Sequence, residues 1–216
     1  MAKSAAILEL EQFFKAFPLK KFKKGENVLE VDQPLTHCSF LVDGFVRQFS
    51  VSEEGEDFTL TVFKPGAFFP CNLLLHRETN PYYFEALTDV SLRLAPKQEL
   101  IKFVKSHPKV LFDLFYRVTS GVNGLLFRME SLIFGTAQQK VAAAIYFNAK
   151  RFGAANTGKK IKIDFPLTHQ QIASLTGLTR ETVSLEMMKL KKKELIDYRA
   201  QQITVLEPAE LKEISS

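Results

Sequence analysis

The sequence has few of the residues that extracellular, metal-binding and membrane proteins need. Only two of its 216 residues are cysteines, Cys38 and Cys71. Two thiols without a paired spacing make neither a disulfide framework nor a zinc or iron–sulfur site, so we expect both to be buried, with a redox pair as the alternative. The longest apolar run, 141–147, is too short to span a bilayer, and no secretory signal pattern is present. We therefore expect a cytoplasmic protein with no membrane contact.

The signatures of enzyme sites are also missing. The chain has no His-x-His pair, no glycine-rich phosphate loop and no nucleophile motif, and its four histidines fall on separate expected elements. A metal-dependent barrel enzyme would need histidines and a carboxylate that converge on one ion. These absences indicate a binding protein and not an enzyme.

Basic charge is concentrated near the C-terminal end. The chain has 29 Lys+Arg and 24 Asp+Glu, a net charge of +5. Residues 1–135 hold 16 of each sign, so the whole excess, 13 against 8, lies in residues 136–216. Such an excess is expected where phosphates are neutralised, although a lysine run is more often only a solvated face.

The stretch 166–193, PLTHQQIASLTGLTRETVSLEMMKLKKK, has the pattern of two short helices joined by a tight turn. Thr168 with Gln171 three residues later predicts a capping box, and Gly177 supplies the left-handed residue that ends the first helix. Thr179 caps the second helix, whose apolar residues recur at spacings of four and three. The stretch therefore predicts a helix-turn-helix, whose second helix enters the DNA major groove.

Four residues point outward from the first turns of that second helix, and we expect them to read bases: Arg180, Glu181, Ser184 and Leu185. An arginine bonds guanine O6 and N7 as a fork, and a glutamate accepts from the cytosine amino group. The alternative is that Arg180 and Glu181 form an ordinary solvated first turn. The small Ala173, the turn glycine and the apolar Val183 favour the first interpretation, because two closely crossed helices need these residue types.

Short apolar runs alternate with turn residues over 20–94, which predicts an antiparallel barrel or roll. We expect strands at 27–31 and 58–63, an Asp-Gly hairpin within 40–51, and a strand pair at 82–87 and 91–94. Short helices are expected at 5–17 and 96–106.

A long helix is expected over 108–134, about 40 Å at the usual rise per residue. Seven apolar residues recur along it at steps of four and three, as in a parallel two-stranded coiled coil: Leu111, Phe115, Val118, Val122, Leu125, Met129 and Leu132. The alternative is that this seam packs on the sheet of its own chain. A second apolar face holds Leu114, Leu126, Phe127 and Ile133. We therefore expect one face to pack on the roll and the other on a second copy.

The expected fold is α+β in three parts. Gly135-Thr136 ends the long helix, and the sequence then predicts a helix over 137–152, a strand at 160–165 and a two-stranded wing at 196–199 and 202–206. The parts are a jelly-roll-like β-roll sensor domain at 1–107, a dimerisation helix at 108–135 and a winged helix-turn-helix DNA-binding domain at 136–216.

This order of parts resembles the Crp/Fnr family of bacterial transcription regulators. The resemblance is strongest over 166–196, with LTHQQIASLTGLTRETVS, and continues in FKKGE and KPGAFF within 18–70. It implies a cyclic-nucleotide-binding-like roll, a homodimer, a pseudo-palindromic site in double-stranded DNA, and RNA polymerase as a partner. It also implies that Arg180 and Glu181 read bases. The resemblance further implies that Gln170 and Thr182 touch phosphate, and we expect phosphate contacts also at Thr168, His169, Thr179 and Lys191.

The sequence departs from the family pattern at two places. Leu185 stands where a second arginine is frequent and leaves only an apolar contact, such as one to a thymine methyl group. In the roll, the positions that hold phosphate in cyclic-nucleotide-binding members look like Pro70-Cys71 and about Asn80-Pro81. We therefore expect no cyclic nucleotide. Haem at His76 and an iron–sulfur cluster are not expected either, and no other cofactor is predicted.

The aromatic residues of the roll predict one further site. Eight side chains would line an apolar effector pocket for an aromatic or lipid-like ligand: Phe68, Phe69, Leu73, Leu74, Tyr82, Tyr83, Leu125 and Leu126. The alternative is that these side chains fill the space themselves. The sequence leaves the effector, the target genes and the direction of regulation open. The alternative function is a ligand-sensing module that acts through protein partners instead of DNA.

Overall fold

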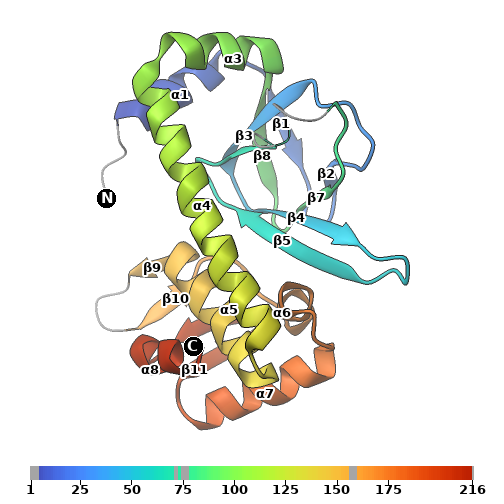
Figure 1. The fold of residues 1–216 in the computed structure, drawn as a ribbon, viewed down its shortest axis with the longest axis vertical. Coiled ribbons are helices and arrows are strands. Elements are labelled where there is room, and N and C mark those ends of the chain that lie inside the picture. Colours follow the sequence, from blue (N-terminus) through green and yellow to red (C-terminus); the bar gives the residue numbers. More distant parts are fainter. Residues whose placement is uncertain (1–4, 71–72, 74–77, 156–159, 216) are drawn as a thin grey trace. The chain divides into compact units, whose positions relative to one another are not determined.

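The computed structural model describes residues 5–70, 73, 78–155 and 160–215 (Figure 1). The chain divides into two compact units, one of Met1–Ser50 with Leu60–Val122 and the other of Val51–Thr59 with Asn123–Ser216. Among the described helices, none combines the length and the apolar character needed to cross a bilayer.

The roll consists of two four-stranded sheets, in the orders β1-β8-β3-β6 and β2-β7-β4-β5. The described pairings are antiparallel, which confirms the expected roll. Its strands are β1 Leu19–Phe22, β2 Asn27–Leu29, β3 His37–Asp43, β4 Val46–Val51, β5 Asp57–Phe63, β6 Phe68–Phe69, β7 Tyr83–Ala86 and β8 Val90–Pro96.

Two expected strand pairs are wrong, because their strands belong to different sheets. The Asp-Gly turn at Asp43 and Gly44 joins β3 to β4, and residues 87–89 join β7 to β8, so the chain passes from one sheet to the other at both places. The turn signals mark the reversals correctly but do not fix the pairing partner. The two corners contact each other, since the backbone N–H of Phe45 donates to Thr88 Oγ1 at 3.0 Å.

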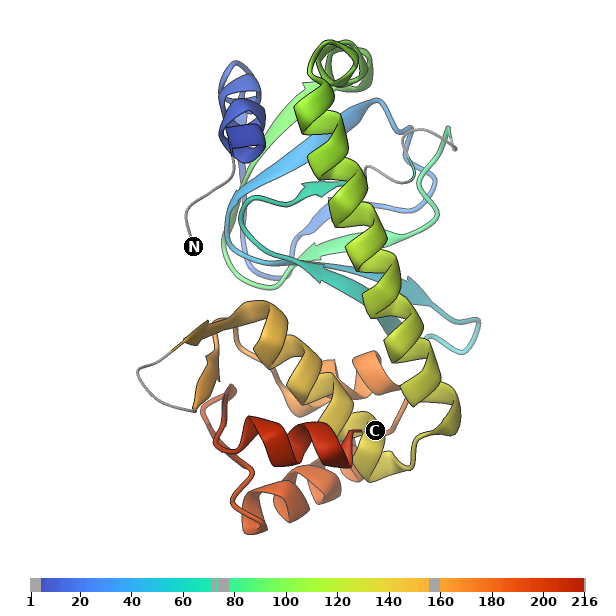
Figure 2. The same ribbon diagram turned by 60° about the vertical axis from the view of Figure 1, so that its left-hand side comes forward.

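Two helices cover one end of the roll, α1 (Ala5–Lys15) and α3 (Lys97–Ser106) (Figures 1 and 2). They contact each other through Phe13 and Phe103, whose stacked rings have centroids 4.3 Å apart. Both helices border a cluster of buried side chains from the roll. The expected short helices are thus confirmed, with ends one or two residues inside the expected ranges.

The second unit contains the expected winged helix-turn-helix. Its sheet has the order β11-β12-β10-β9, and β11 pairs with β12 as the wing. Helix α5 contacts α6, α7 and α8. The elements are α5 Ala137–Phe152, β9 Gly153–Ala155, β10 Ile161–Ile163, α6 His169–Thr176, α7 Arg180–Lys192, β11 Ile196–Arg199, β12 Gln202–Val205 and α8 Pro208–Ile214.

Helix α4 extends over Pro108–Phe134, as the sequence predicts. Most of its seam is exposed in the single chain. Leu132 is half-buried, and the other six seam residues are 47% to 63% exposed.

The second apolar face of α4 differs from the expectation. Leu114 is buried, but Leu126, Phe127 and Ile133 are 39% to 66% exposed, so the expectation that this face packs on the roll is wrong for these three residues. Periodicity places residues around a helix axis but does not determine what covers them.

Substitution of Gly44 tests the contact between the two corners. Gly25 and Gly44 have nearly equal φ, 87° and 86°. Alanine at Gly25 meets no atom within 4 Å and should cost only the left-handed conformation, about 1–2 kcal/mol. A Cβ at Gly44 would lie 2.3 Å from Asp89 O, so Gly44→Ala should lose at least about 2 kcal/mol more of unfolding free energy. Urea unfolding measures both, and equal losses would contradict the contact.

Candidate nucleic-acid interface

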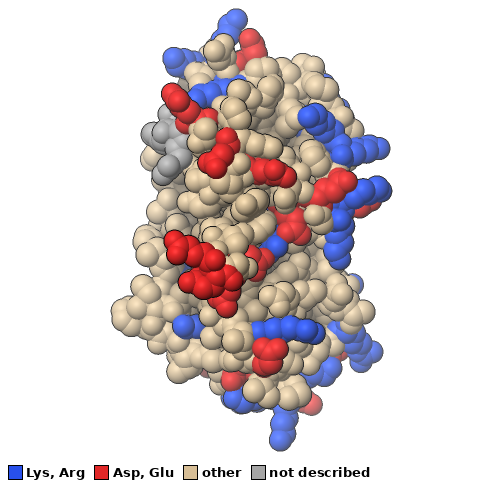
Figure 3. Space-filling view, turned by 90° about the vertical axis from the view of Figure 1, so that its right-hand side faces the viewer, with Lys and Arg blue, Asp and Glu red and all other residues tan. Residues whose placement is uncertain are grey.

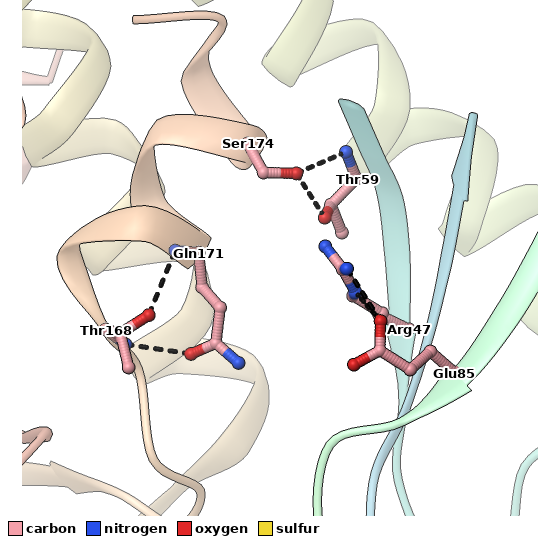
Figure 4. A network of polar contacts seen from close by, with 6 residues as sticks. All are labelled: Arg47, Thr59, Glu85, Thr168, Gln171 and Ser174. Atoms are coloured by element: carbon pink, nitrogen blue, oxygen red, sulfur yellow. Dashed lines mark hydrogen bonds and ion pairs between the residues drawn. The ribbon is translucent and has the colours of Figure 1, made fainter. Parts of the chain in front are cut away.

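Helix α6 begins with the capping box and ends with the left-handed glycine that its sequence predicts. Thr168 Oγ1 accepts from the backbone N–H of Gln171 at 3.1 Å, and Gln171 Oε1 accepts from that of Thr168 at 2.8 Å (Figure 4). Gly177 is left-handed, with φ 65° and ψ 25°, and its N–H donates to Ala173 O at 2.9 Å. Both devices are local, and both are confirmed.

Helix α7 turns an apolar stripe inward and its first polar residues outward. Val183, Met187 and Leu190 have no exposed surface. Because these positions are separated by four and three residues, they share one face of the helix. Of the expected base-reading residues, Glu181 and Leu185 are exposed and Ser184 is half-buried on another side of the helix. Arg180, three residues before Val183, continues the line of the stripe but is exposed at the first position of α7. The helix can therefore present this end to a groove without disturbing its core.

A groove of about 470 Å³ lies between the start of α6, α7 and the wing. The backbone N–H of Leu167 donates to Gln201 O at 2.7 Å, so the wing turn is attached to the chain that enters α6. The polar side chains on the groove come from all three elements: Thr168, His169, Gln170, Arg180, Tyr198 and Gln201. Three expected phosphate contacts and one expected base reader thus share one concave surface.

The wing carries a charge pair that the sequence reasoning missed. Lys191 Nζ lies 2.8 Å from Asp197 Oδ1 and 4.8 Å from the centroid of the Tyr198 ring. The hydrogen bond from Lys191 lowers the pKa of Asp197, so this carboxylate is ionised at neutral pH. The sequence predicts a phosphate contact for Lys191. In the free protein its ammonium group is paired with the Asp197 carboxylate. No motif in the wing sequence predicts this pair.

His169 lies at the start of α6, against the wing and near α7. Its ring meets the Tyr198 ring edge to face, with centroids 5.4 Å apart. Burial lowers the pKa of His169, and the charge of Arg180 lowers it further. The imidazole is therefore neutral at pH 7 in the free protein.

The lysines that lie beside the helix-turn-helix in the sequence are exposed. Six are exposed in the described residues: Lys160, Lys162, Lys189, Lys191, Lys192 and Lys193. Lys159 lies outside them. On the face drawn in Figure 3, acidic side chains gather into patches, with basic side chains beside them.

The C-terminal end of α6 is held by polar contacts that no sequence pattern indicates. Ser174 Oγ accepts from the backbone N–H of Thr59 at 3.0 Å and lies 2.7 Å from Thr59 Oγ1 (Figure 4). Arg128 donates to Leu175 O at 2.7 Å and also to Thr59 O. Burial lowers the pKa of Arg128 to about 10, which still leaves it charged at pH 7. Within the second unit, residues 51–59 and α4 thus hold α6.

Two polar side chains of the roll, Asn80 and Arg47, already have partners within it. Asn80 is fully buried, and its Nδ2 donates to Glu30 O at 2.8 Å and to Tyr82 O. The guanidinium of Arg47 is 2.6 Å from Glu85 Oε2, so its charge is matched by that carboxylate (Figure 4). Asn80 therefore fixes the loop backbone and does not fit as a phosphate ligand.

The expected effector pocket is divided between different surfaces. Phe69 is buried, with ring centroids 4.7 Å from Phe63 and 5.3 Å from Phe84. Tyr83 precedes Phe84 on β7, so the two side chains point to opposite faces of the sheet, and Tyr83 stacks on Phe49 at 5.2 Å. The aromatic rings inside the roll thus pack on one another.

The other expected pocket residues lie in several places. Leu73 is buried, and Phe68 and Tyr82 are half-buried against the cores. Leu125 and Leu126 are exposed residues of α4. Leu74, Cys71 and His76 lie outside the described residues. Cys38 is buried, and among the described residues no group of three or more His, Cys, Asp or Glu side chains could hold a metal ion.

Comparison with known proteins gives the same two-part organisation. The Crp-like helix-turn-helix domain matches residues 139–214, and the cyclic nucleotide-binding domain matches residues 19–107. The transcriptional regulator SdrP of Thermus thermophilus is 29% identical over 196 residues, which cover 90% of this chain and 92% of SdrP. The global nitrogen regulator of Nostoc sp. PCC 7120 is 26% identical over 200 residues, 91% of this chain and 89% of the regulator.

The fold is also that of a protein whose structure is solved. The structure of FixK2 from Bradyrhizobium japonicum has a TM-score of 0.80 at 23% identity and covers 93% of this chain and 98% of FixK2. A β-roll, a long helix and a winged helix-turn-helix together define a class of DNA-binding transcription regulators, which are not enzymes. Within this class, the chain belongs to the Crp/Fnr family.

Proposed function

We propose that this regulator acts as a homodimer that binds a two-fold-symmetric DNA site and reads bases with Arg180 and Glu181. The observation that carries the proposal is that both side chains are exposed at the start of α7, while the inward stripe of this helix is fully buried. An arginine there bonds guanine as a fork, and a glutamate accepts from cytosine. Ser184 and Leu185, one turn later, complete the surface that faces the bases.

The proposed phosphate contacts lie at the edges of this surface. Thr168, His169 and Gln170 begin α6 beside the groove. Thr179 and Thr182 begin α7, and their hydroxyl oxygens are 2.9 Å apart. Helix starts are favourable places for phosphate oxygens, because their free N–H groups and dipole attract anions. Lys191 adds charge at the other end of α7.

The exposed seam of α4 supports the homodimer. Six half-exposed apolar side chains at heptad spacing form a stripe that a second copy of the same helix would cover. Two copies of α7 would then reach half-sites about one helical turn, ~34 Å, apart. A ligand that changes the pose of the pair would change DNA binding through the population of the competent pose. We include RNA polymerase as a partner because the chain is a transcription regulator.

We also propose that the roll does not respond to a cyclic nucleotide. The buried and fully engaged Asn80 supports this view, as does the departure from the family pattern at Pro70-Cys71. An apolar effector remains the alternative to rings that simply fill the roll.

Selection of bound sequences from random duplex DNA should return a two-fold-symmetric motif. Arg180→Ala should then weaken binding to the selected site by about 1–3 kcal/mol and leave binding to random DNA nearly unchanged. Lys191→Ala is the contrasting variant, because loss of a phosphate contact weakens both kinds of binding alike. Fluorescence anisotropy measures the affinities of the wild type and both variants for the two DNAs. Equal losses for Arg180→Ala on the two DNAs would remove its role as a base reader.

Sedimentation should show a dimer that Val122→Glu or Leu125→Glu dissociates. A carboxylate in the centre of an apolar seam loses its hydration without gaining a partner, which costs several kcal/mol. Ser120→Glu is the matched control, because this exposed residue of α4 lies outside the seam. If all three variants stay dimeric, the seam is not the interface.

Calorimetric titration with cyclic AMP and cyclic GMP should show no binding, because the described roll lacks a free donor at Asn80. The control is the same titration after Asn80→Ala, which should also be silent if Asn80 serves only the loop backbone. A saturable heat signal with the wild-type chain would overturn the proposal on cyclic nucleotides.

A further inference from the structure

His169 combines a position on the groove with a charge that depends on pH. It lies between Thr168 and Gln170 on the groove wall, and Arg180 lines the same groove. An anion beside His169 would therefore contact a titratable ring and lie near the charge of Arg180, whose own contact in the proposed complex is with a base. Among the described residues, no other histidine lines this groove.

We propose that His169 is a proton-linked phosphate contact, neutral in the free protein and protonated when a DNA phosphate enters the groove. The inference rests on the proposed function, since it assigns a regulation to the same DNA site. The affinity of the protein for DNA then depends on pH.

The groups around His169 decide the direction of the effect. From α7 it faces Arg180, whose positive charge opposes a second cation. From the wing it faces the uncharged Tyr198 ring. Behind that ring, Lys191 and Asp197 pair at 2.8 Å, and Arg199 Nε lies 3.4 Å from the other carboxylate oxygen of Asp197, so this cluster keeps one positive charge. With burial added, the free protein disfavours imidazolium.

A bound phosphate reverses this balance. Its negative charge offsets Arg180 and gives the imidazolium N–H a strong acceptor, so the pKa of His169 rises on binding. A group whose pKa is higher in the complex than in the free protein takes up a proton on binding. Affinity therefore increases as pH falls between the two pKa values, by up to about tenfold per pH unit for each protomer.

The test measures the dissociation constant of the full-length chain for a selected duplex, from pH 8.0 to pH 6.0. The wild type should bind at least about tenfold more tightly at pH 6.0 than at pH 8.0. At pH 6.0 the slope of log affinity against log salt should be steeper by about 0.9 for each protomer, because one more phosphate is neutralised. The NMR titration of the His169 ring should show a higher pKa in the complex than in the free protein.

Three variants separate His169 from the other titrating groups. His169→Gln cannot gain charge, so it should lose most of the gain at low pH. His169→Arg is always charged, so it should bind more tightly than the wild type at pH 8.0 with little further change. His37→Gln is the matched control in the first unit, where His37 is exposed on β3, and it should keep the wild-type profile. Thermal unfolding at both pH values checks that each variant is folded.

The outcomes distinguish this inference from the function on which it rests. A flat wild-type profile, or one that His169→Gln leaves unchanged, overturns the proton-linked contact while specific binding at pH 8.0 stands. Failure to select any DNA motif at either pH overturns the proposed function itself.

Discussion

The surface that we propose for DNA binding depends on the close crossing of α6 and α7 at Gly177. A left-handed residue is needed there to reverse the chain within a few residues, and glycine adopts this conformation without the steric cost of a Cβ. Ala173, 4% exposed, keeps α6 narrow at the crossing, and Val183 fills the space on α7. Once this stripe is buried, Glu181 must face outward, because it lies on another side of the helix. Arg180 continues the line of the stripe, but at the first position of α7 it lies beyond the buried part and stays exposed.

Much of the second unit could be predicted because the residues that define its helix ends and strands are close together in the sequence. The Thr168–Gln171 capping box, the left-handed glycine and the two strands of the wing each lie within a few residues of sequence, and the structure has all of them. The bounds of α4 follow from Pro108 at its start and from an uninterrupted heptad pattern. The expected division into three domains and the expected roles in DNA contact stay predictions.

The sequence could not show which residues far apart in the chain contact each other, or what packs on each apolar face. Thr59 and Ser174 are 115 positions apart, and neither carries a motif that marks a partner. The turn at Gly44 reverses the chain as its sequence predicts, but the next strand belongs to the other sheet. The partner of a strand depends on contacts throughout the roll and not on the turn alone. The expected effector pocket rests on residue types alone. On a strand, neighbours such as Tyr83 and Phe84 point to opposite faces, so composition alone does not make them one lining.

The exposed stripe on α4 has a consequence for how such a regulator responds to its own abundance. If the seams pair as proposed, folding stability and assembly are linked by mass action, and thermal stability rises with protein concentration. Below the dissociation constant of the dimer, the amount of DNA-binding species grows with the square of the chain concentration. A twofold change in synthesis would then change promoter occupancy about fourfold at low occupancy, by mass action alone. The unpaired chains would meanwhile expose a continuous apolar surface of the kind that quality-control proteases and chaperones recognise.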